Sequence, residues 1–237
     1  MLNKIKLENI LFLDIETVPE GSQFSELSEL KQKLFADKTQ YQRRDEISAE
    51  DFYERAGIWA EFGKIICISV GYFVPAEGNR SFRVKTFSGE EQELLLSFKK
   101  LLDGHFNRPE HLLCAHNGKE FDFPYIARRM IIRNIKLPEK LNLFGKKPWE
   151  VAHIDTLELW KFGDYKHYTS LDLLTNILGI PSPKQGIDGS QVAKVYYEEN
   201  NLEKIIEYCE RDTIAVAQLL LRFNNLETLN KEDIVFV

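Results

Sequence analysis

Residues 9–16 read Asn-Ile-Leu-Phe-Leu-Asp-Ile-Glu, an apolar run that becomes acidic at its end. A short apolar run of this length predicts a buried β-strand. Side chains two residues apart on a strand point to the same face of the sheet, so Asp14 and Glu16 are expected side by side. Burying two carboxylates is costly unless they are paired or bind a cation. Two solvent-facing residues at a strand end are the simpler alternative.

Outward from this strand, the pattern of apolar runs and breaks predicts an α/β fold, with a five-stranded mixed sheet flanked by helices. The other expected strands cover residues 64–74, 81–87, 111–115 and 151–155. The expected helices cover residues 90–102, 122–133, 170–178, 190–199 and 202–222. A turn over residues 75–80 makes a hairpin of the strands on either side of it. Ser88-Gly89-Glu90-Glu91 has the pattern of a capping box that opens the next helix.

The 237 residues are expected to form a single domain with a charged helical insertion at about residues 20–62, a stretch rich in Glu, Gln, Lys and Ser. No apolar run is long enough to cross a bilayer, and the N-terminus shows no signal pattern, so a membrane protein is not expected. Cys67, Cys114 and Cys209 lie far apart in apolar stretches. They predict neither a disulfide framework nor a zinc cluster and favour a cytoplasmic location.

Charge is distributed unevenly along the chain. The whole chain has a net charge of -6, which argues against a broad nucleic-acid grip. Residues 99–147, however, carry 11 basic and 5 acidic groups, a net charge of +6, whereas residues 1–62 and 195–237 each have a net charge of -5. This distribution predicts a positive surface beside a negative pocket, with a solvated mixture of charges as the alternative.

Three further residues extend the acidic pattern. Asp122 stands at a loop-to-helix junction, where an N-cap is a strong alternative. Tyr208 and Asp212 are spaced i, i+4 on the flank of the apolar stripe of the last helix, so they are neighbours. If these groups converge with Asp14 and Glu16, oxygen ligands without His or Cys suit Mg²⁺ or Mn²⁺. Two such ions about 3.5–4 Å apart can clamp the attacking and leaving oxygens of a phosphodiester displacement.

Three segments carry a resemblance to a known family. Phe12-Leu13-Asp14-Ile15-Glu16-Thr17 resembles the first exonuclease motif of the DEDD superfamily. His116-Asn117-Gly118-Lys119-Glu120-Phe121-Asp122-Phe123-Pro124-Tyr125 resembles the second, in the form seen in family-B DNA polymerase proofreading domains. Tyr208-Cys209-Glu210-Arg211-Asp212 resembles the third motif of the tyrosine (DEDDy) branch, since the histidine branch needs a histidine where Glu207 stands. Their order over residues 10–220 is similar to that of stand-alone bacterial proteins related to this exonuclease domain.

The resemblance implies a ribonuclease-H-like fold and metal-dependent 3′→5′ hydrolysis of single-stranded DNA, with release of nucleoside monophosphates. It implies that Asp14 bridges two Mg²⁺ or Mn²⁺ ions, that Glu16 and Asp212 complete the first metal site, and that Asp122 serves the second. Tyr208 would orient the attacking water, because an unperturbed tyrosine has a pKa of about 10 and is a poor base.

The same resemblance implies substrate contacts. Thr17 would touch the 3′-terminal nucleotide, and Asn117 and Phe121 would line the path of the penultimate one. Lys119 belongs to the basic middle segment, which becomes a candidate path for the phosphates of a single strand. The candidate path comprises Lys119, Arg128, Arg129, Arg133, Lys136, Lys140, Lys146 and Lys147.

Other functions compete with this interpretation. A 3′→5′ exoribonuclease is the nearest, because the same site can cleave either backbone and sugar discrimination depends on pocket shape. A catalytically weak domain that binds nucleic acid or tethers a partner is another, although all five motif positions are filled. A third is an interaction module that uses residues 20–62 to bind a polymerase or repair complex. Proofreading and DNA repair are the processes that the leading interpretation suggests.

Four weaker features have simpler structural interpretations. Asp155 is a possible outer-shell carboxylate, but a helix N-cap is preferred. In residues 184–190, Lys184 and the loop amides could meet a phosphate, but an N-cap at Ser190 is preferred. His116 and His153 are expected to be hydrogen-bonded structural residues. The three tryptophans are expected in the core or at its boundary: Trp59, Trp149 and Trp160.

Overall fold

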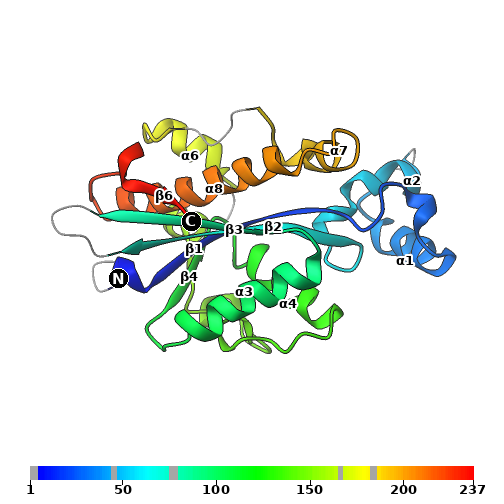
Figure 1. The fold of residues 1–237 in the computed structure, drawn as a ribbon. Helices are drawn as coiled ribbons and strands as arrows, with labels where there is room; N and C mark the ends of the chain where they lie inside the picture. The colour runs from blue at the N-terminus through cyan, green and yellow to red at the C-terminus, as the bar shows by residue number, and fades with distance from the viewer. Residues whose placement is uncertain (1–4, 44–46, 75–79, 165–167, 182–185) are drawn as a thin grey trace.

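The sheet is built around β1 (Ile10–Pro19), the strand predicted from residues 9–16. The computed structural model describes residues 5–43, 47–74, 80–164, 168–181 and 186–237. Within these residues six strands take the order β5-β4-β1-β2-β3-β6 (Figure 1). β1 pairs antiparallel with β2 and parallel with β4, so it is central and covered on both sides. The remaining strands are β2 (Gly63–Val74), β3 (Ser81–Ser88), β4 (Leu112–Ala115), β5 (Ile154–Asp155) and β6 (Ile234–Phe236).

The sixth strand corrects the expected number of five. β6 has three residues and runs parallel to β3, in register from Phe82 opposite Ile234 to Val84 opposite Phe236. A segment this short has too little periodicity to be recognised locally, and its pairing depends on a strand far away in the chain. The hairpin of β2 and β3 is confirmed by their antiparallel register. Its predicted turn falls on residues 75–79, outside the described part of the chain.

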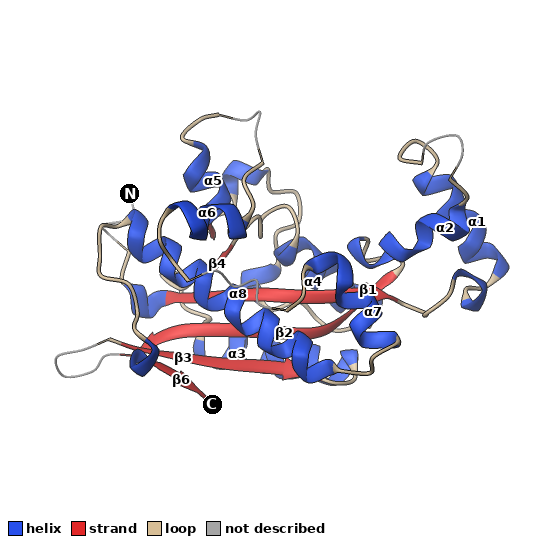
Figure 2. Cartoon of the chain, turned by 90° about the horizontal axis from the view of Figure 1, so that it is seen from above, coloured by secondary structure: helices blue, strands red, loops and turns tan. Residues whose placement is uncertain are grey.

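Helices cover both faces of this sheet (Figure 1). On one face, α3 and α4 pack against a core that includes Leu11, Leu13 and Ile15 of β1. On the other face lie α6, α7 and α8, and α8 crosses β1 and β2 (Figure 2). Ile10 and Phe12 of β1 face this second layer. The helices are α3 (Glu91–His105), α4 (Asp122–Ile132), α5 (Thr156–Lys161), α6 (Leu171–Ile177), α7 (Val192–Tyr197) and α8 (Leu202–Phe223).

A β-bulge interrupts the pairing of β1 with β2. Glu16 lies opposite Cys67, but the next residue, Thr17, lies opposite Ile65. The extra residue is therefore Ile66 on β2. Ile66 and Cys67 both belong to the apolar cluster beneath α7 and α8, so two consecutive side chains face the same way. Bulges of this kind re-aim side chains and are common beside functional sites.

Residues 20–62 contain helices that lie beyond one end of the sheet (Figure 1). Phe35 forms the centre of a small aromatic core, with ring-centre distances of 5.4 Å to Tyr53, 5.9 Å to Trp59 and 5.2 Å to Phe62. Whether residues 1–237 are a single exonuclease domain with an insertion stays a prediction. The helices of this segment are η3 (Phe24–Glu26), α1 (Glu29–Thr39), α2 (Ala49–Phe52) and η4 (Tyr53–Ile58). Further 3-10 turns are η2 (Leu7–Asn9), η5 (Glu139–Leu141), η6 (Pro148–Glu150), η7 (Gly189–Gln191) and η8 (Lys231–Asp233).

A buried ion cluster joins α3, α4 and β2, and it overturns two expectations. Glu91 accepts hydrogen bonds from Arg129 Nε at 2.7 Å, from Arg129 Nη2 at 2.6 Å and from Ile65 N–H at 2.8 Å. Its carboxylate is therefore not available for the predicted capping box, and the N-cap of α3 is Glu90, without a side-chain hydrogen bond. Arg129 is 2% exposed, so it leaves the predicted phosphate path. Arg133 also pairs with Glu91, at 2.7 Å.

The predicted N-cap at Ser190 is also wrong. Asp188 is the N-cap of η7, and its carboxylate accepts hydrogen bonds from both the backbone N–H and the hydroxyl of Ser190. The chain becomes helical at Gly189, earlier than expected, so Asp188 and not Ser190 occupies the N-cap position. Lys184 lies outside the described residues. No helix in the described part of the chain has the length and apolar character that a membrane span requires.

Candidate active site

Asp14 and Glu16 interrupt the apolar side of β1 that faces α8. They lie opposite Ser69 and Cys67 of β2, one residue before the bulge. The thiol of Cys209 on α8 donates to Asp14 Oδ2 at 3.3 Å and approaches the Asp14 carbonyl oxygen at 3.4 Å. One potential ligand atom each from Asp14, Glu16 and Cys209 all lie within 4.8 Å of one another. The expected pairing of the two carboxylates on one face is confirmed.

The long helix α8 supplies the third carboxylate. Its first turn is capped by Asn201, whose side chain accepts from Lys204 N–H at 3.1 Å. Tyr208 and Asp212 both lie on its buried side, against β1 and β2, with exposed fractions of 7% and 9%. The tyrosine hydroxyl makes a side-chain hydrogen bond to the carboxylate of Asp212. The i, i+4 spacing therefore builds a hydrogen-bonded pair inside the site.

Asp122 enters from the opposite layer. It is the first residue of α4, but the N-cap position falls on Phe121 and no side chain caps the helix there. The carboxylate of Asp122 instead accepts a hydrogen bond from the backbone N–H of Ile15. The pairing of β1 with β4 ends at Phe12, so this N–H lies beyond the last β4 partner. Asp122 thus docks on β1 between the two acidic residues of that strand.

Burial, and after it the charges of neighbouring groups, raises the pKa values of the carboxylates in the candidate site. Burial raises the pKa of Asp14, and the charges of Asp212, Glu16 and Asp122 raise it further. Burial likewise raises the pKa of Glu16, with contributions from Cys67, Asp212 and Asp122. For Asp122, burial raises the pKa to about 8 against the hydrogen bonds that oppose it. Among the described residues no lysine or arginine forms a salt bridge with Asp14, Glu16 or Asp122.

Two tyrosines have pKa values that the charges of these carboxylates help to raise. Burial raises the pKa of Tyr208 far above its ordinary value, and Asp212 adds to the shift, so its hydroxyl stays protonated at neutral pH. Tyr168 is a second such residue, and it is not predicted from the sequence. Its side chain is 67% exposed, and partial burial together with the charges of Asp122, Asp155 and Asp212 raises its pKa. No local pattern marks Tyr168, because it lies in a connecting segment.

The four residues predicted to touch substrate have structural contacts of their own. The hydroxyl of Thr17 hydrogen-bonds to Tyr125. Phe121 is half-buried, with its ring centre 5.3 Å from that of Tyr125. Asn117 has a left-handed backbone with φ of 63°. Lys119 Nζ pairs with Glu158 at 2.7 Å, so a phosphate would compete with that carboxylate. Contacts of these four residues with substrate stay predictions.

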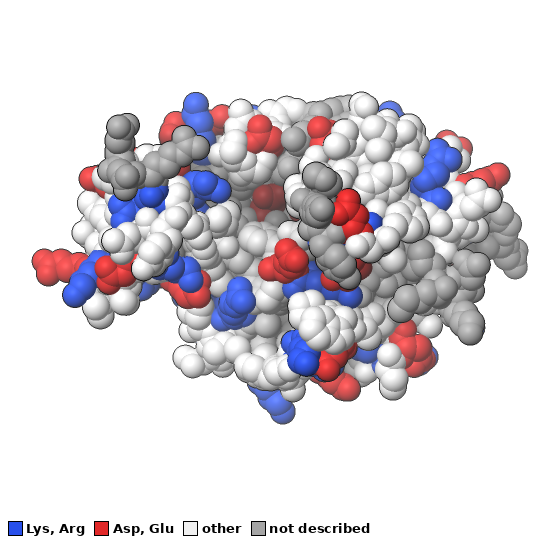
Figure 3. Space-filling view, turned by 180° about the vertical axis from the view of Figure 1, so that it is seen from behind, with Lys and Arg blue, Asp and Glu red and all other residues white. Residues whose placement is uncertain are grey.

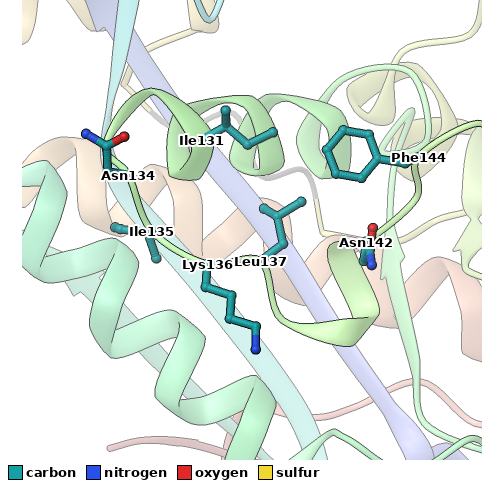
Figure 4. A pocket seen from close by; sticks show the side chains of 7 residues that line it. All are labelled: Ile131, Asn134, Ile135, Lys136, Leu137, Asn142 and Phe144. Atoms are coloured by element: carbon teal, nitrogen blue, oxygen red, sulfur yellow. The ribbon is translucent and has the colours of Figure 1, made fainter.

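Some lysines of the basic middle segment, residues 99–147, are exposed beyond the end of α4. A groove of about 530 Å³ is lined there by residues that include Lys136 and Phe144 (Figure 4). Phe144 is 74% exposed and Trp149 is 76% exposed, which makes the core or boundary assignment of Trp149 wrong. Lys147 Nζ lies 5.3 Å from the centre of the Trp149 ring. Exposed aromatic rings beside lysines are typical of surfaces that hold single strands.

Figure 3 shows one face of the molecule, which is hollowed near its centre. Acidic side chains lie in the hollow, and lysine and arginine side chains gather beside it. The donor set of the candidate site consists of carboxylates, with one thiol beneath them. Carboxylate oxygens are the ligands that Mg²⁺ and Mn²⁺ prefer, and a divalent cation would relieve the repulsion that raises these pKa values. The residues therefore fit such ions.

Parts of this chain are similar to two DNA polymerases. "DNA polymerase 1" of Aeropyrum pernix is 28% identical over 152 residues, which cover 57% of this chain and 14% of that protein. The family B DNA polymerase of Pyrobaculum calidifontis matches structurally with a TM-score of 0.55 and 15% identity, over 90% of this chain and 24% of that one. This likeness shows the predicted ribonuclease-H-like α/β fold. The chain spans only a small part of both polymerases.

A family profile matches residues 58–234, which contain the second and third acidic motifs. The family is described as a predicted 3′-5′ exonuclease related to the exonuclease domain of PolB. This match covers most of the chain and confirms the resemblance to exonucleases related to the family-B polymerase domain. The chain belongs to this family of 3′-5′ exonucleases related to the exonuclease domain of PolB.

Proposed function

We propose that the protein is a metal-dependent exonuclease that removes nucleoside monophosphates from the 3′ end of single-stranded DNA. The observation that carries the proposal is the convergence of four carboxylates from three separate elements. The charges of Asp212, Glu16 and Asp122 raise the pKa of the buried Asp14, and a divalent cation would compensate them. Among the described residues no lysine or arginine forms a salt bridge with Asp14, Glu16 or Asp122, so a cation that neutralises their charge is the simplest explanation of this costly burial.

In this proposal, Asp14, Glu16 and Asp212 hold one Mg²⁺ or Mn²⁺ ion, and Asp14 and Asp122 hold a second. When bound, two such ions supply positive charge for the attacking and leaving oxygens and lower the pKa of the attacking water. Without them, the carboxylates repel the phosphodiester, since like charges about 4 Å apart repel by several kcal/mol in a protein interior. Substrate binding should therefore depend on the ions as strongly as hydrolysis does.

In this scheme Tyr208 orients the attacking water and does not remove a proton from it. Its raised pKa keeps the hydroxyl protonated, and that proton is donated to Asp212. The phenolic oxygen still has lone pairs that can accept a hydrogen bond from the attacking water. Replacement by phenylalanine removes this acceptor for the water and also the hydrogen bond that the hydroxyl donates to Asp212. We expect kcat to fall about 10- to 100-fold with KM nearly unchanged, because one positioning hydrogen bond is lost.

The proposal is tested by digesting 5′-labelled single-stranded DNA and the matching RNA with the wild type and with Asp14→Ala. Mg²⁺, Mn²⁺ and excess EDTA are compared for each. We expect mononucleotides to be released stepwise from the 3′ end of DNA by the wild type with metal only, and no release by Asp14→Ala. Undiminished hydrolysis in EDTA would sink the metal-dependent scheme.

The same experiment separates the competing functions. Faster digestion of RNA than of DNA would make the protein an exoribonuclease, since the candidate site can act on either backbone. Binding of both strands without cleavage in either metal would instead favour a nucleic-acid-binding or tethering domain. A polymerase or repair complex as partner, and a role in proofreading, remain further parts of the proposal that need the natural substrate.

A further inference from the structure

The first turn of α5 makes an unusual set of contacts with the loop that leads to Asp122. Asp155 is the N-cap of α5, as the sequence predicts, and its Oδ1 accepts from Leu157 N–H at 2.9 Å and Glu158 N–H at 3.3 Å. The same Oδ1 also accepts from Asn117 N–H at 2.9 Å, and Oδ2 accepts from Lys119 N–H at 3.1 Å. One buried carboxylate, 3% exposed, thus holds two segments together.

Neighbouring residues of α5 reinforce this connection. Thr156 Oγ1 lies 2.9 Å from His116 Nδ1, and His116 Nε2 lies 2.9 Å from the carbonyl oxygen of Thr169. That carbonyl can only accept, so Nε2 carries the proton. Burial lowers the pKa of His116, so the ring is neutral, and Nδ1 accepts from the threonine hydroxyl. The Glu158 pair with Lys119 adds a further contact at 2.7 Å.

Backbone hydrogen bonds connect the Asn117–Lys119 turn to the residues on either side of Asp122. Phe121 N–H bonds to the Asn117 carbonyl at 3.0 Å, and Phe123 N–H bonds to the Gly118 carbonyl at 2.9 Å. Gly118 is packed so closely that an added Cβ would lie 2.4 Å from the Cβ of Ala115. Because the Asn117–Lys119 turn is hydrogen-bonded on both sides and closely packed, it fixes the position at which α4 begins. Placing Asp155 near Asp122 carries an electrostatic cost, because its charge raises the pKa of Asp122.

We propose that Asp155 is a positioning residue of this site, which holds the Asn117–Lys119 turn so that Asp122 meets β1 where the second ion would bind. The inference rests on the proposed function for its catalytic consequence, but its structural claim does not. An N-cap alone needs only two of the four hydrogen bonds that this carboxylate accepts. The two bonds to the loop are what a helix cap leaves unexplained.

Asp155→Asn separates the two roles. Asparagine is as good an N-cap as aspartate, so Oδ1 can keep its bonds to α5. The amide nitrogen, however, would face the N–H of Lys119, donor against donor. We expect kcat to fall about 10- to 100-fold, and the weaker of two Mn²⁺ affinities, measured by electron paramagnetic resonance without DNA, to fall by a similar factor. The melting temperature should change little.

Matched variants make the test decisive. Ser170→Ala removes the N-cap oxygen of α6, which accepts from Leu173 N–H at 3.2 Å, and should leave kcat and Mn²⁺ binding unchanged. Thr156→Val keeps the Asp155 contacts but removes the hydroxyl that meets His116, and should cause a smaller loss of Mn²⁺ affinity. It also serves as the second variant if Asp155→Asn does not fold.

Wild-type kcat, KM and Mn²⁺ affinities in Asp155→Asn would overturn the inference and leave a plain helix cap. A loss of activity that only follows a loss of folded protein would overturn it as well. Weaker Mn²⁺ binding in Asp155→Asn, together with a wild type that hydrolyses neither DNA nor RNA, would support the positioning role and reject the exonuclease proposal. The failures of the two proposals are therefore distinguishable.

Discussion

Two buried clusters of charge lie on opposite faces of the same sheet and differ in how they are neutralised. Beneath the sheet, Glu91 is surrounded by Arg129, Arg133 and a backbone N–H. Burial alone would raise the pKa of Glu91, but the hydrogen bonds from Arg129 and Ile65 outweigh it and hold the pKa below its ordinary value. Above the sheet, burial and mutual repulsion raise the pKa values of Asp14 and its neighbours.

In our proposal, this difference separates charge that stabilises the fold from charge that binds a metal ion. The Glu91 cluster carries its own counter-ions and ties α3, α4 and β2 together. In the candidate site, by contrast, no described lysine or arginine forms a salt bridge with Asp14, Glu16 or Asp122. Sites that bind ligands often retain strain of this kind, which substitution can relieve at the expense of function.

Substitution of Asp14 should give the largest effect, with activity and stability moving in opposite directions. We expect Asp14→Asn to lower the rate of DNA hydrolysis on the order of 10³-fold. In EDTA it should raise the free energy of unfolding by about 1 kcal/mol or more, because one repelling charge is gone. Urea unfolding measures the second quantity. Asp37→Asn, at an exposed position of α1, is the control, and a destabilised Asp14→Asn would break the comparison.

Substitution of Glu91 should affect stability directly. Glu91→Gln leaves Arg129 buried without its charge partner, and we expect the free energy of unfolding to fall by about 3–5 kcal/mol. Glu93→Gln, on the same helix but exposed, should change it by less than about 0.5 kcal/mol. Urea unfolding followed by circular dichroism measures both. Equal stability of the two variants would mean that the ion cluster does not hold the layers together.

The pH dependence of stability should differ in sign between the clusters. The folded-state pKa of Asp122, about 8, lies above its ordinary value of 3.8, so the folded state binds more protons between them. In EDTA, stability should therefore fall as pH rises from about 4 to about 8, by up to about 1.4 kcal/mol per pH unit for each such proton. Glu91, with its lowered pKa, loses its contribution only as pH falls below its ordinary range.

Thermal unfolding in EDTA across this pH range measures the slope. Mg²⁺ or Mn²⁺ should flatten it, because a cation favours the ionised carboxylates. Asp122→Asn should also reduce it, since the group that titrates is removed. Stability that stays level or rises between pH 5 and pH 8 in EDTA would show that the carboxylates do not repel one another in the folded protein.

The exposed lysines should give the smallest effect. Reversing Lys146 and Lys147 to glutamate in the Asp14→Asn background should lower the salt dependence of single-strand binding by about one unit of slope per lysine. Lys33→Glu with Lys38→Glu on α1 is the matched control. Fluorescence anisotropy at several salt concentrations measures the slopes. An unchanged slope would remove this surface from the path of the strand.

The parts of the molecule that could be predicted from sequence are those written in local patterns. β1 follows from one apolar run, and the Tyr208–Asp212 pair follows from helical spacing. β6 depends on a partner about 150 residues away, which no local pattern reveals. Arg129 looks like surface charge until Glu91 is brought against it by the packing of α3 on α4. Long-range partners, and not the motifs themselves, account for these errors.

The same reason explains what was missed at the site. The sequence favours a helix N-cap for Asp155 over an outer-shell carboxylate, and its two hydrogen bonds to the Asn117–Lys119 turn depend on β4 and β5 lying side by side. Asp122 was expected at a helix start, but the Ile15 N–H that it accepts from is free for this role only because β4 is short. A candidate functional residue can be recognised from its local sequence, whereas the residues that hold it in place come together only in the folded chain.

The extra residue at Ile66 has a consequence for how the sheet tolerates change. Side chains along a strand alternate between the two faces of the sheet. The bulge switches which of the alternate residues of β2 point to which face. Gly63, before the switch, meets the Tyr125 hydroxyl so closely that a Cβ would lie 2.3 Å from it, whereas Cys67, after it, faces Glu16. Deleting Ile66 would remove this switch, and one half of β2 would then turn its side chains to the opposite face of the sheet.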